Sequence, residues 1–300
     1  MMAAFASSTA LRGELRRAEP MAAHVSWRAG GAARVWYRPA DAADLGHFLA
    51  QERGPVLFVG LGSNLLVRDG GWPGAVVNLY NTLDDIDWQA QGRVRVGAGV
   101  HCATLAAQAA RRGWAGATFL GGIPGTIGGA LAMNAGAWGG ETWPVVRAVT
   151  TVNRQGQRQE HPAAAFQASY RSLQMPEPEM CFVAAELEFA PGADAGELQT
   201  QLRTMLAERR ARQPVGRPSC GSVFRNPPGH FAAELIERAG LKGAVEGDAE
   251  VSTKHANFIL NRGAATAADI ETLMLRVQRA VRERFGIALQ AEVRIVGEPA

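Results

Sequence analysis

The chain of 300 residues is poor in cysteine and lysine. Its three cysteines, Cys102, Cys181 and Cys220, are widely spaced and form no C-x-x-C pair, which argues against a disulfide framework or a cysteine-rich metal site and fits a reducing cytosol. Only Lys242 and Lys254 are lysines, the net charge is +3, and acidic residues are scattered among the basic ones. The sequence therefore lacks the basic stripe of a nucleic-acid binder, and we expect neither a nucleic-acid partner nor a metal.

Long apolar runs and targeting signals are also missing. Residues 113–140 contain no charge and include G-x-x-x-G, but ten glycines and Pro124 stand where a membrane span needs leucine, isoleucine and valine. At the N-terminus, arginines follow a short apolar patch, whereas a secretory signal has its charges first. We therefore expect a cytoplasmic protein without a membrane span, in which residues 1–20 form a loosely ordered tail or docking arm. The oligomeric state stays open.

Glycine is abundant, with 35 residues, and separates short strand-like runs from amphipathic, helix-like runs. The length favours two domains, at about 100–200 residues per domain, and Pro191-Gly192 marks a boundary. Strands and helices alternate on both sides of it, so the class is α/β or α+β. The predicted strands cover residues 56–59, 75–79, 94–96, 145–152, 181–189, 257–260 and 292–296. The predicted helices cover residues 103–112, 163–170, 196–212, 231–239 and 267–285.

A first glycine-rich segment, G-L-G-S-N, covers residues 60–64 and directly follows the predicted strand at residues 56–59. Glycine lets a backbone approach a ligand closely, and successive amides in such a loop can form a nest for an anion. The segment has G-x-G but not the full dinucleotide fingerprint, and no clear helix follows it, which argues against a Rossmann site. The residues alone leave two interpretations open, a phosphate-binding loop and a tight turn between strands.

A second glycine-rich segment reads G-G-I-P-G-T-I-G-G-A over residues 121–130 and continues as M-N-A-G-A over residues 133–137. An ordinary helix would not tolerate so many glycines, each costing about 1 kcal/mol relative to alanine. Pro124 suits the first turn of a helix, whose free amides could face a pyrophosphate. Close packing of a helix on a sheet is the alternative, but two such segments together favour a large phosphate-bearing cofactor.

Three further features are unremarkable when taken singly. Ser222 lies in the run S-C-G-S-V-F-R-N-P, which lacks the G-x-S-x-G elbow of a hydrolase, and a lone serine is usually a cap or turn residue. Glu292 opens a short apolar strand, where an acid usually faces water. The pair Tyr170-Arg171 likewise carries no signal of its own.

Together and in this order, these motifs resemble those of the MurB family, the UDP-N-acetylenolpyruvoylglucosamine reductases, which are flavoenzymes of peptidoglycan precursor synthesis. The resemblance runs from about Ala29 to Gly297 and includes K-H-A-N-F from Lys254. It implies an α+β fold, in which a two-part FAD-binding module of the vanillyl-alcohol-oxidase type precedes an α+β substrate-binding domain. With residues 1–20 as the tail, the implied ranges are 21–190 for the FAD module, with subdomains at about 21–80 and 81–190, and 196–297 for the substrate-binding domain.

The resemblance also implies the chemistry. NADPH would reduce a non-covalently bound FAD and leave, and UDP-N-acetylglucosamine enolpyruvate would then take the hydride and become UDP-N-acetylmuramate. Arg171 and Glu292 would stabilise the enolic charge, and Ser222 would protonate the neighbouring carbon. The implied substrate contacts are Tyr170, Arg225, Asn226, His255 and Arg210. The implied FAD contacts are Gly60, Gly62, Ser63, Asn64, Leu65, Gly122, Ile123, Pro124, Gly125, Thr126, Gly128, Gly129, Asn134 and Gly136.

Some family members clamp the substrate diphosphate with a tyrosine on a loop of the third domain, but the tyrosines here are Tyr37, Tyr80 and Tyr170. The chain thus resembles the subclass without that loop, and Arg210 or Arg217 becomes a candidate for the diphosphate. Two other functions remain as alternatives. One is an oxidase of the same flavin fold that acts on an alcohol or sugar, and the other is a non-catalytic nucleotide-binding module, which would be colourless when purified.

Overall fold

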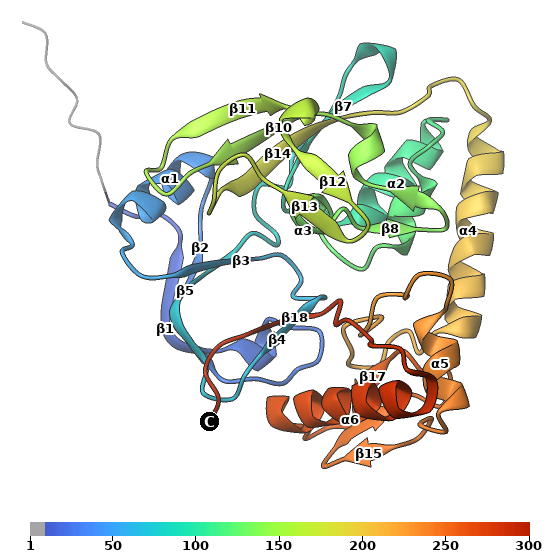
Figure 1. Ribbon diagram of the computed structural model, residues 1–300. Helices are drawn as coiled ribbons and strands as arrows, with labels where there is room; N and C mark the ends of the chain where they lie inside the picture. The colour runs from blue at the N-terminus through green and yellow to red at the C-terminus, as the bar shows by residue number, and fades with distance from the viewer. Residues whose placement is uncertain (1–9) are drawn as a thin grey trace, which may run out of the picture.

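The computed structural model describes residues 10–300, and its N-terminal part is a four-stranded sheet (Figure 1). The first two strands are antiparallel, and the other neighbours run parallel. Helix α1 (Ala42–Gln51) is capped by Asp41, whose side chain accepts a hydrogen bond from the backbone N–H of Asp44. In order across the sheet, the strands are β1 (Glu14–Pro20), β2 (Ala32–Arg38), β5 (Trp72–Asn78) and β3 (Val56–Val59).

Strand β1 corrects the expectation that residues 1–20 form a tail. Residues 14–20 pair along the edge of the sheet with β2. The preceding residues are anchored as well, because the backbone N–H of Arg12 donates to Oδ1 of the buried Asp44 at 2.8 Å. An edge strand tolerates charged side chains, so β1 has a sequence that is hard to tell from a tail. Residues 1–9 of the expected tail lie outside the described residues.

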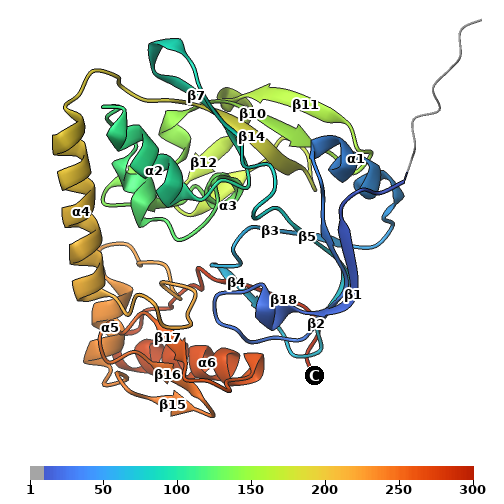
Figure 2. The ribbon, with the colours of Figure 1, turned by 180° about the vertical axis from the view of Figure 1, so that it is seen from behind.

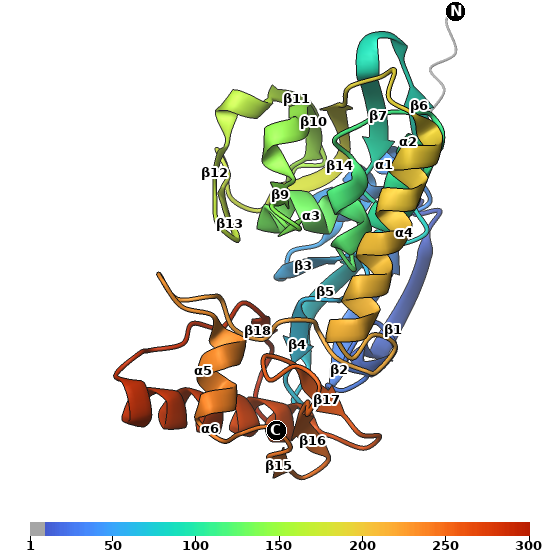
Figure 3. The ribbon, with the colours of Figure 1, turned by 90° about the vertical axis from the view of Figure 1, so that its right-hand side faces the viewer.

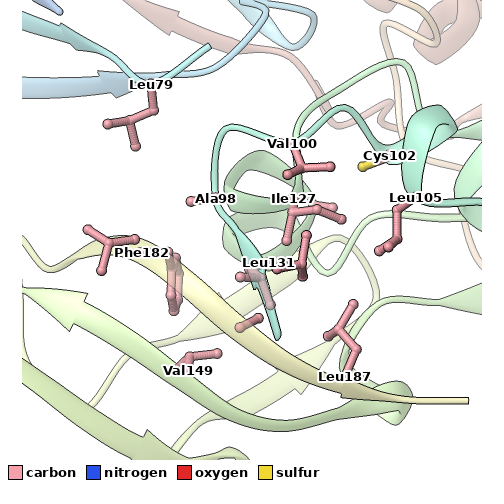
Figure 4. Packing of buried hydrophobic residues seen from close by; sticks show 14 of the residues in the cluster. Leu79, Ala98, Val100, Cys102, Leu105, Ile127, Leu131, Val149, Phe182 and Leu187 are labelled. Atoms are coloured by element: carbon pink, nitrogen blue, oxygen red, sulfur yellow. The ribbon is translucent and has the colours of Figure 1, made fainter. Parts of the chain in front are cut away.

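The second sheet has five antiparallel strands and carries the largest hydrophobic core. Figure 4 shows Ile127 and Leu131 beside Phe182 and Leu187 in this core, so that one helix packs directly on the sheet. In order across the sheet, the strands are β11 (Arg158–Pro162), β10 (Val146–Val152), β14 (Cys181–Glu188), β7 (Arg93–Gly97) and β6 (Ile86–Trp88). The helices of this unit are α2 (Cys102–Arg111) and α3 (Ile127–Met133).

Residues 163–170 correct a second expectation, because they do not form a helix. Only a 3₁₀ turn covers Ala163–Ala165, and the buried Phe166 then packs against Trp143 and Phe182. A short helix is unstable by itself, because helix nucleation is costly. Packing of the Phe166 ring in the core therefore decides the local structure, and the backbone at Phe166 is extended. The chain continues as a hairpin of β12 (Gln167–Ser169) and β13 (Ser172–Gln174), and a smaller hairpin joins β8 (Gly136–Ala137) to β9 (Gly140–Glu141).

The C-terminal unit packs two helices on a three-stranded sheet around its own core. Its long helix has the predicted bounds, with a capping box between Thr266 and Asp269 at the start and a left-handed Gly286 at the end. The helices are α5 (Ala232–Arg238) and α6 (Ala267–Phe285). The strands are β15 (Val245–Glu246), β16 (Ala249–Val251) and β17 (Ile259–Asn261).

Helix α4 (Ala195–Arg212) connects the unit built on the second sheet to the C-terminal unit, and it runs from α2 to α5 (Figures 1 and 2). We expected it within the substrate-binding domain, but its buried residue Leu202 belongs to the core of the second sheet. An added Cβ on Gly121 would lie 2.6 Å from the Leu202 side chain, so the helix packs closely on this unit. Its C-terminal turn therefore lies between the two units.

The C-terminal unit is also joined to the first sheet. Strand β18 (Arg294–Val296) pairs in parallel with β4 (Leu65–Val67), and both lie between these two parts of the molecule (Figure 3). The indole N–H of the buried Trp27 donates to the backbone carbonyl of Ile259 at 2.7 Å. These contacts bring residue 292, just before β18, next to the glycine-rich loop just before β4.

Candidate active site

A cavity of about 770 Å³ lies where the three parts of the molecule meet. Its walls come from the loop after β3, the segment before α3, the β12–β13 turn, the end of α4 and the C-terminal unit. Pockets of this size, with a few convergent polar groups, are typical of ligand sites. Of the predicted site residues, those on the wall are Gly60, Gly62, Ser63, Asn64, Leu65, Gly122, Ile123, Pro124, Gly125, Thr126, Gly129, Gly136, Arg171, Ser222, His255 and Glu292.

The loop at residues 60–64 presents unused backbone donors to this cavity. Among residues 10–300, no hydrogen bond engages the backbone N–H groups of these five residues. Gly62 has φ +59°, and a Cβ there would lie 2.2 Å from the carbonyl oxygen of His24. A Cβ on Gly60 would lie 2.3 Å from Oγ1 of Thr126, so the two glycine-rich segments touch. This arrangement has the free amides and the close approach of an anion-binding nest.

The second glycine-rich segment differs from the expected helix N-terminus with free amides. Helix α3 is capped by Thr126 rather than opened by Pro124. Its first two N–H groups, those of Ile127 and Gly128, donate to the carbonyls of Val100 and Ala98 at 2.9 and 2.8 Å. These amides are held by the chain that follows β7, and the packing interpretation applies to this end of the helix. Gly128 accordingly lies against Ala98 and not on the cavity wall.

Arg171 and Glu292 meet at the cavity as an ion pair. Arg171 lies in the turn between β12 and β13, and its Nε is 3.0 Å from Oε1 of Glu292. Its Nη2 also donates to the carbonyl of Gly136 at 2.9 Å, which fixes the guanidinium. Burial raises the pKa of the Glu292 carboxyl, although the cations of Arg171 and Arg225 oppose that rise. The carboxyl is thus held closer to its neutral form than an exposed glutamate would be.

Ser222 lies on the same wall, in a loop that is clamped on both sides. The backbone N–H groups of Val223 and Phe224 donate to Asn257, through its carbonyl and its Oδ1, at 2.9 and 3.0 Å. The N–H of Glu292 donates to the carbonyl of Val223 at 2.8 Å. Ser222 and Glu292 are therefore carried on two adjacent, hydrogen-bonded segments. Their side chains reach one cavity with that of Arg171, which comes from a different unit.

Comparison with known proteins accounts for this arrangement. Residues 36–161 match the family model of an FAD binding domain, and residues 213–296 match that of the C-terminal domain of UDP-N-acetylenolpyruvoylglucosamine reductase. The chain is 54% identical to the UDP-N-acetylenolpyruvoylglucosamine reductase of Methylococcus capsulatus, over 96% of this chain and 94% of that protein. It is 52% identical to the enzyme of that name from Alkalilimnicola ehrlichii, over 95% and 96%. This chain belongs to the UDP-N-acetylenolpyruvoylglucosamine reductase family.

A solved structure supports the same conclusion for the fold. The crystal structure of the UDP-N-acetylenolpyruvylglucosamine reductase MurB from Thermus caldophilus aligns with a TM-score of 0.80 at 30% identity, covering 95% of this chain and 98% of that one. The family, the α+β class and the FAD-binding module that the motifs predicted are confirmed, and with them a flavoprotein reductase. Within residues 10–300, none of the helices combines the length and apolar character that crossing a bilayer requires.

Asn134, a predicted FAD contact of this reductase family, is buried away from the cavity wall. It ends α3 with φ +40° and accepts a hydrogen bond from the backbone N–H of Trp143 at 3.1 Å. Its Nδ2 donates to Glu141 and to the carbonyl of Ser169, at 2.9 and 3.1 Å. The residue thus ties the end of α3 to the turn that carries Arg171.

Only one of the predicted substrate contacts, His255, reaches the cavity wall. Burial lowers the pKa of its imidazole, which favours the neutral form at pH 7. Of the others, Tyr170 is 48% exposed beside the cavity, Arg225 donates to the carbonyl of Arg171, and Asn226 accepts from the backbone N–H of Ala232 at the start of α5. Arg210 is exposed on α4, and its carbonyl accepts from Lys254.

Two arginines that the motifs did not indicate, Arg209 and Arg212, line the cavity instead of Arg210. Helical geometry explains the difference, since Glu208, Arg209 and Arg212 lie on one face of α4 and Arg210 lies on the other side. Burial lowers the pKa of Arg209, whose Nε donates to Gln213 at 3.0 Å. The wall also includes Phe231 and Arg294, and their positions in sequence carried no signal.

Proposed function

We propose that this protein reduces UDP-N-acetylglucosamine enolpyruvate to UDP-N-acetylmuramate with NADPH and FAD, in the cytoplasmic synthesis of peptidoglycan precursors. The observation that carries the proposal is the convergence of Arg171, Ser222 and Glu292 on the cavity that the loop at residues 60–64 also lines. The family of the chain supports the same reaction. The absence of a tyrosine from residues 196–297, the expected substrate-binding domain, further supports the subclass without the tyrosine loop.

The wall residues fit FAD, which is bound without a covalent link in this proposal. The free amides at residues 60–64 suit a pyrophosphate, and Gly125 brings a second stretch of backbone close to Ser63 without a side chain between them. Leu65, Gly122 and Ile123 extend this wall beside the loop. When bound, FAD would accept hydride from NADPH and deliver it to the enolpyruvyl group.

The side chains on the adjoining wall, next to this loop, suit the substrate half of the reaction. The fixed guanidinium of Arg171 would bind the pyruvyl carboxylate and stabilise the charge that develops on it. Glu292, with its raised pKa, would share a proton with that carboxylate. The Ser222 hydroxyl would donate its proton to the substrate carbon that bears this carboxylate, next to the carbon that accepts the hydride. An enolic carbanion is basic enough to take a proton from an alcohol.

Anaerobic single-turnover spectroscopy tests this function. We expect purified protein to be yellow, NADPH to bleach the flavin, and UDP-N-acetylglucosamine enolpyruvate to restore the colour. Colourless protein would favour the nucleotide-binding module. Yellow protein whose flavin is not reduced by NADPH but is reduced by an alcohol or a sugar would favour the oxidase.

A further inference from the structure

The backbone of Arg171 adopts a conformation that its residue type disfavours. Tyr170 and Arg171 form the two-residue loop between β12 and β13, and Arg171 has φ +53°. Glycine or asparagine is usual at such a position, because a Cβ is strained in the left-handed region. A strained residue of this kind keeps its conformation only where its surroundings hold it.

Two side chains from different units of the molecule hold this turn. Nδ2 of Asn134, at the end of α3, donates to the carbonyl of Ser169 at 3.1 Å. Nη2 of Arg225, in the C-terminal unit, donates to the carbonyl of Arg171 at 3.1 Å. The backbone of Arg225 is itself fixed, since its N–H donates to the carbonyl of Gln290 at 2.9 Å. The turn is thus tied on both sides of the domain boundary.

We propose that Arg225 is a positioning residue, which holds the strained Arg171 turn against the C-terminal unit and so aims the Arg171 guanidinium at the cavity. Arg225 does not line the cavity, and its Nη2 donates to the carbonyl of Arg171 in the turn. Its guanidinium therefore contacts the turn rather than a ligand. Because Arg225 lies three residues after Ser222 on one loop, it sets Arg171 relative to the proton donor.

This inference rests on the proposed function for its kinetic part, and a double-mutant cycle tests that part. In single turnovers, Arg225→Met should slow reoxidation of the reduced flavin by the enolpyruvyl substrate by roughly 10–100-fold, the cost of a misplacement of about 1 Å. The substrate Kd should change less than about threefold and Arg225→Lys should restore most of the rate, because the residue acts through a donated hydrogen bond. In an Arg171→Ala background, Arg225→Met should have almost no further effect. If the fold-changes of Arg225→Met and Arg171→Ala multiply in the double variant, the two residues act independently. That result would overturn the inference and assign Arg225 to substrate binding.

Hydrogen exchange gives a readout that does not depend on activity. In the flavin-loaded protein, Arg225→Met should speed backbone exchange across residues 167–174, whereas Arg225→Lys should leave it close to wild type. Unchanged exchange in Arg225→Met would overturn the inference. If the wild-type protein fails to turn over the substrate but the exchange result holds, the proposed function is wrong and the positioning role stands. Thermal unfolding and flavin content serve as controls for folding.

Discussion

The two walls of the cavity work through different parts of their residues. The loop at residues 60–64 offers backbone N–H groups, and its glycines matter because they lack side chains. The adjoining stretch of wall, joined to this loop by the hydrogen bond from Nδ2 of Asn64 to the carbonyl of Glu292, offers the side chains of Arg171, Ser222 and Glu292. Adding atoms should therefore disable the first wall, and removing atoms should disable the second. The two kinds of substitution should also affect different steps, cofactor binding in one case and substrate reduction in the other.

The largest effect is expected on the side-chain wall, from Ser222→Ala. Loss of the proton donor should slow substrate-dependent reoxidation of the flavin by roughly 10²–10⁴-fold, the range for one general acid. Reduction of the flavin by NADPH should change little, since Ser222 has no role in it. Stopped-flow absorbance measures both half-reactions on one preparation. Equal slowing of the two would make Ser222 a structural residue and remove the contrast between the walls.

Glu292→Gln should give the next largest loss. The amide keeps the shape of the side chain but cannot share a proton, and one electrostatic contact of this kind is worth at least about 2.7 kcal/mol in the transition state. Substrate reduction should therefore fall about 100-fold, while flavin content stays near wild type and the unfolding temperature does not fall. A well-folded yellow Glu292→Gln enzyme with normal turnover would show that this carboxyl only opens a strand.

The pH dependence of Glu292 supplies the matching control. Burial raises the pKa of this carboxyl in the folded state, so the neutral form is the one that folding favours. Its contribution to stability is present below the pKa of the unfolded chain and is lost as pH rises through the folded-state pKa. Wild type should lose stability relative to Glu292→Gln across that window and match it at lower pH. Parallel thermal unfolding curves at all pH values would contradict the raised pKa.

Gly125→Asp probes the backbone wall with a smaller expected effect. A Cβ at this position meets only ordinary contacts, 3.5 Å from Oγ of Ser63, so the fold should accept it. The carboxylate would face the anion nest, where two unit charges about 4 Å apart repel by about 1 kcal/mol in bulk water and by more where water is excluded. FAD affinity should fall roughly tenfold or more, measured as flavin released on dilution. Gly125→Asn, which is neutral and of equal size, should keep most of the flavin, and equal losses would place the pyrophosphate elsewhere.

The same contrast between backbone and side chain decides what could be predicted from the sequence. The long helix at residues 267–285 was predictable because its apolar period, N-cap and glycine C-cap agree. The motif residues Arg171, Ser222 and Glu292 were recognisable through resemblance, although each was unremarkable by itself. Arg209 was missed because one helical position separates a wall residue from an exposed one, and no motif marks that difference.

Long-range hydrogen bonds account for what remained hidden. The motifs predict ligand contacts for Asn134 and Arg225, but their side-chain donors reach the backbone of the Arg171 turn, 35 and 54 residues away in sequence. The amides of α3 gave the same kind of error. Their partners, Val100 and Ala98, come from a separate strand connection, and nothing in the local pattern of residues 121–130 indicates that they are occupied.

Gly128→Ala tests that last correction and should have the smallest effect. A Cβ at residue 128 would lie 3.0 Å from Cβ of Ala98, a tight contact that offsets the gain of about 1 kcal/mol from replacing glycine in a helix. The free energy of unfolding, measured in urea, should therefore change by less than about 1 kcal/mol. Because the N–H of residue 128 donates to Ala98 rather than to a ligand, FAD content should equal that of wild type. Loss of flavin from a stable Gly128→Ala protein would mean that the start of α3 contacts the cofactor after all, and that its amides belong to the backbone wall.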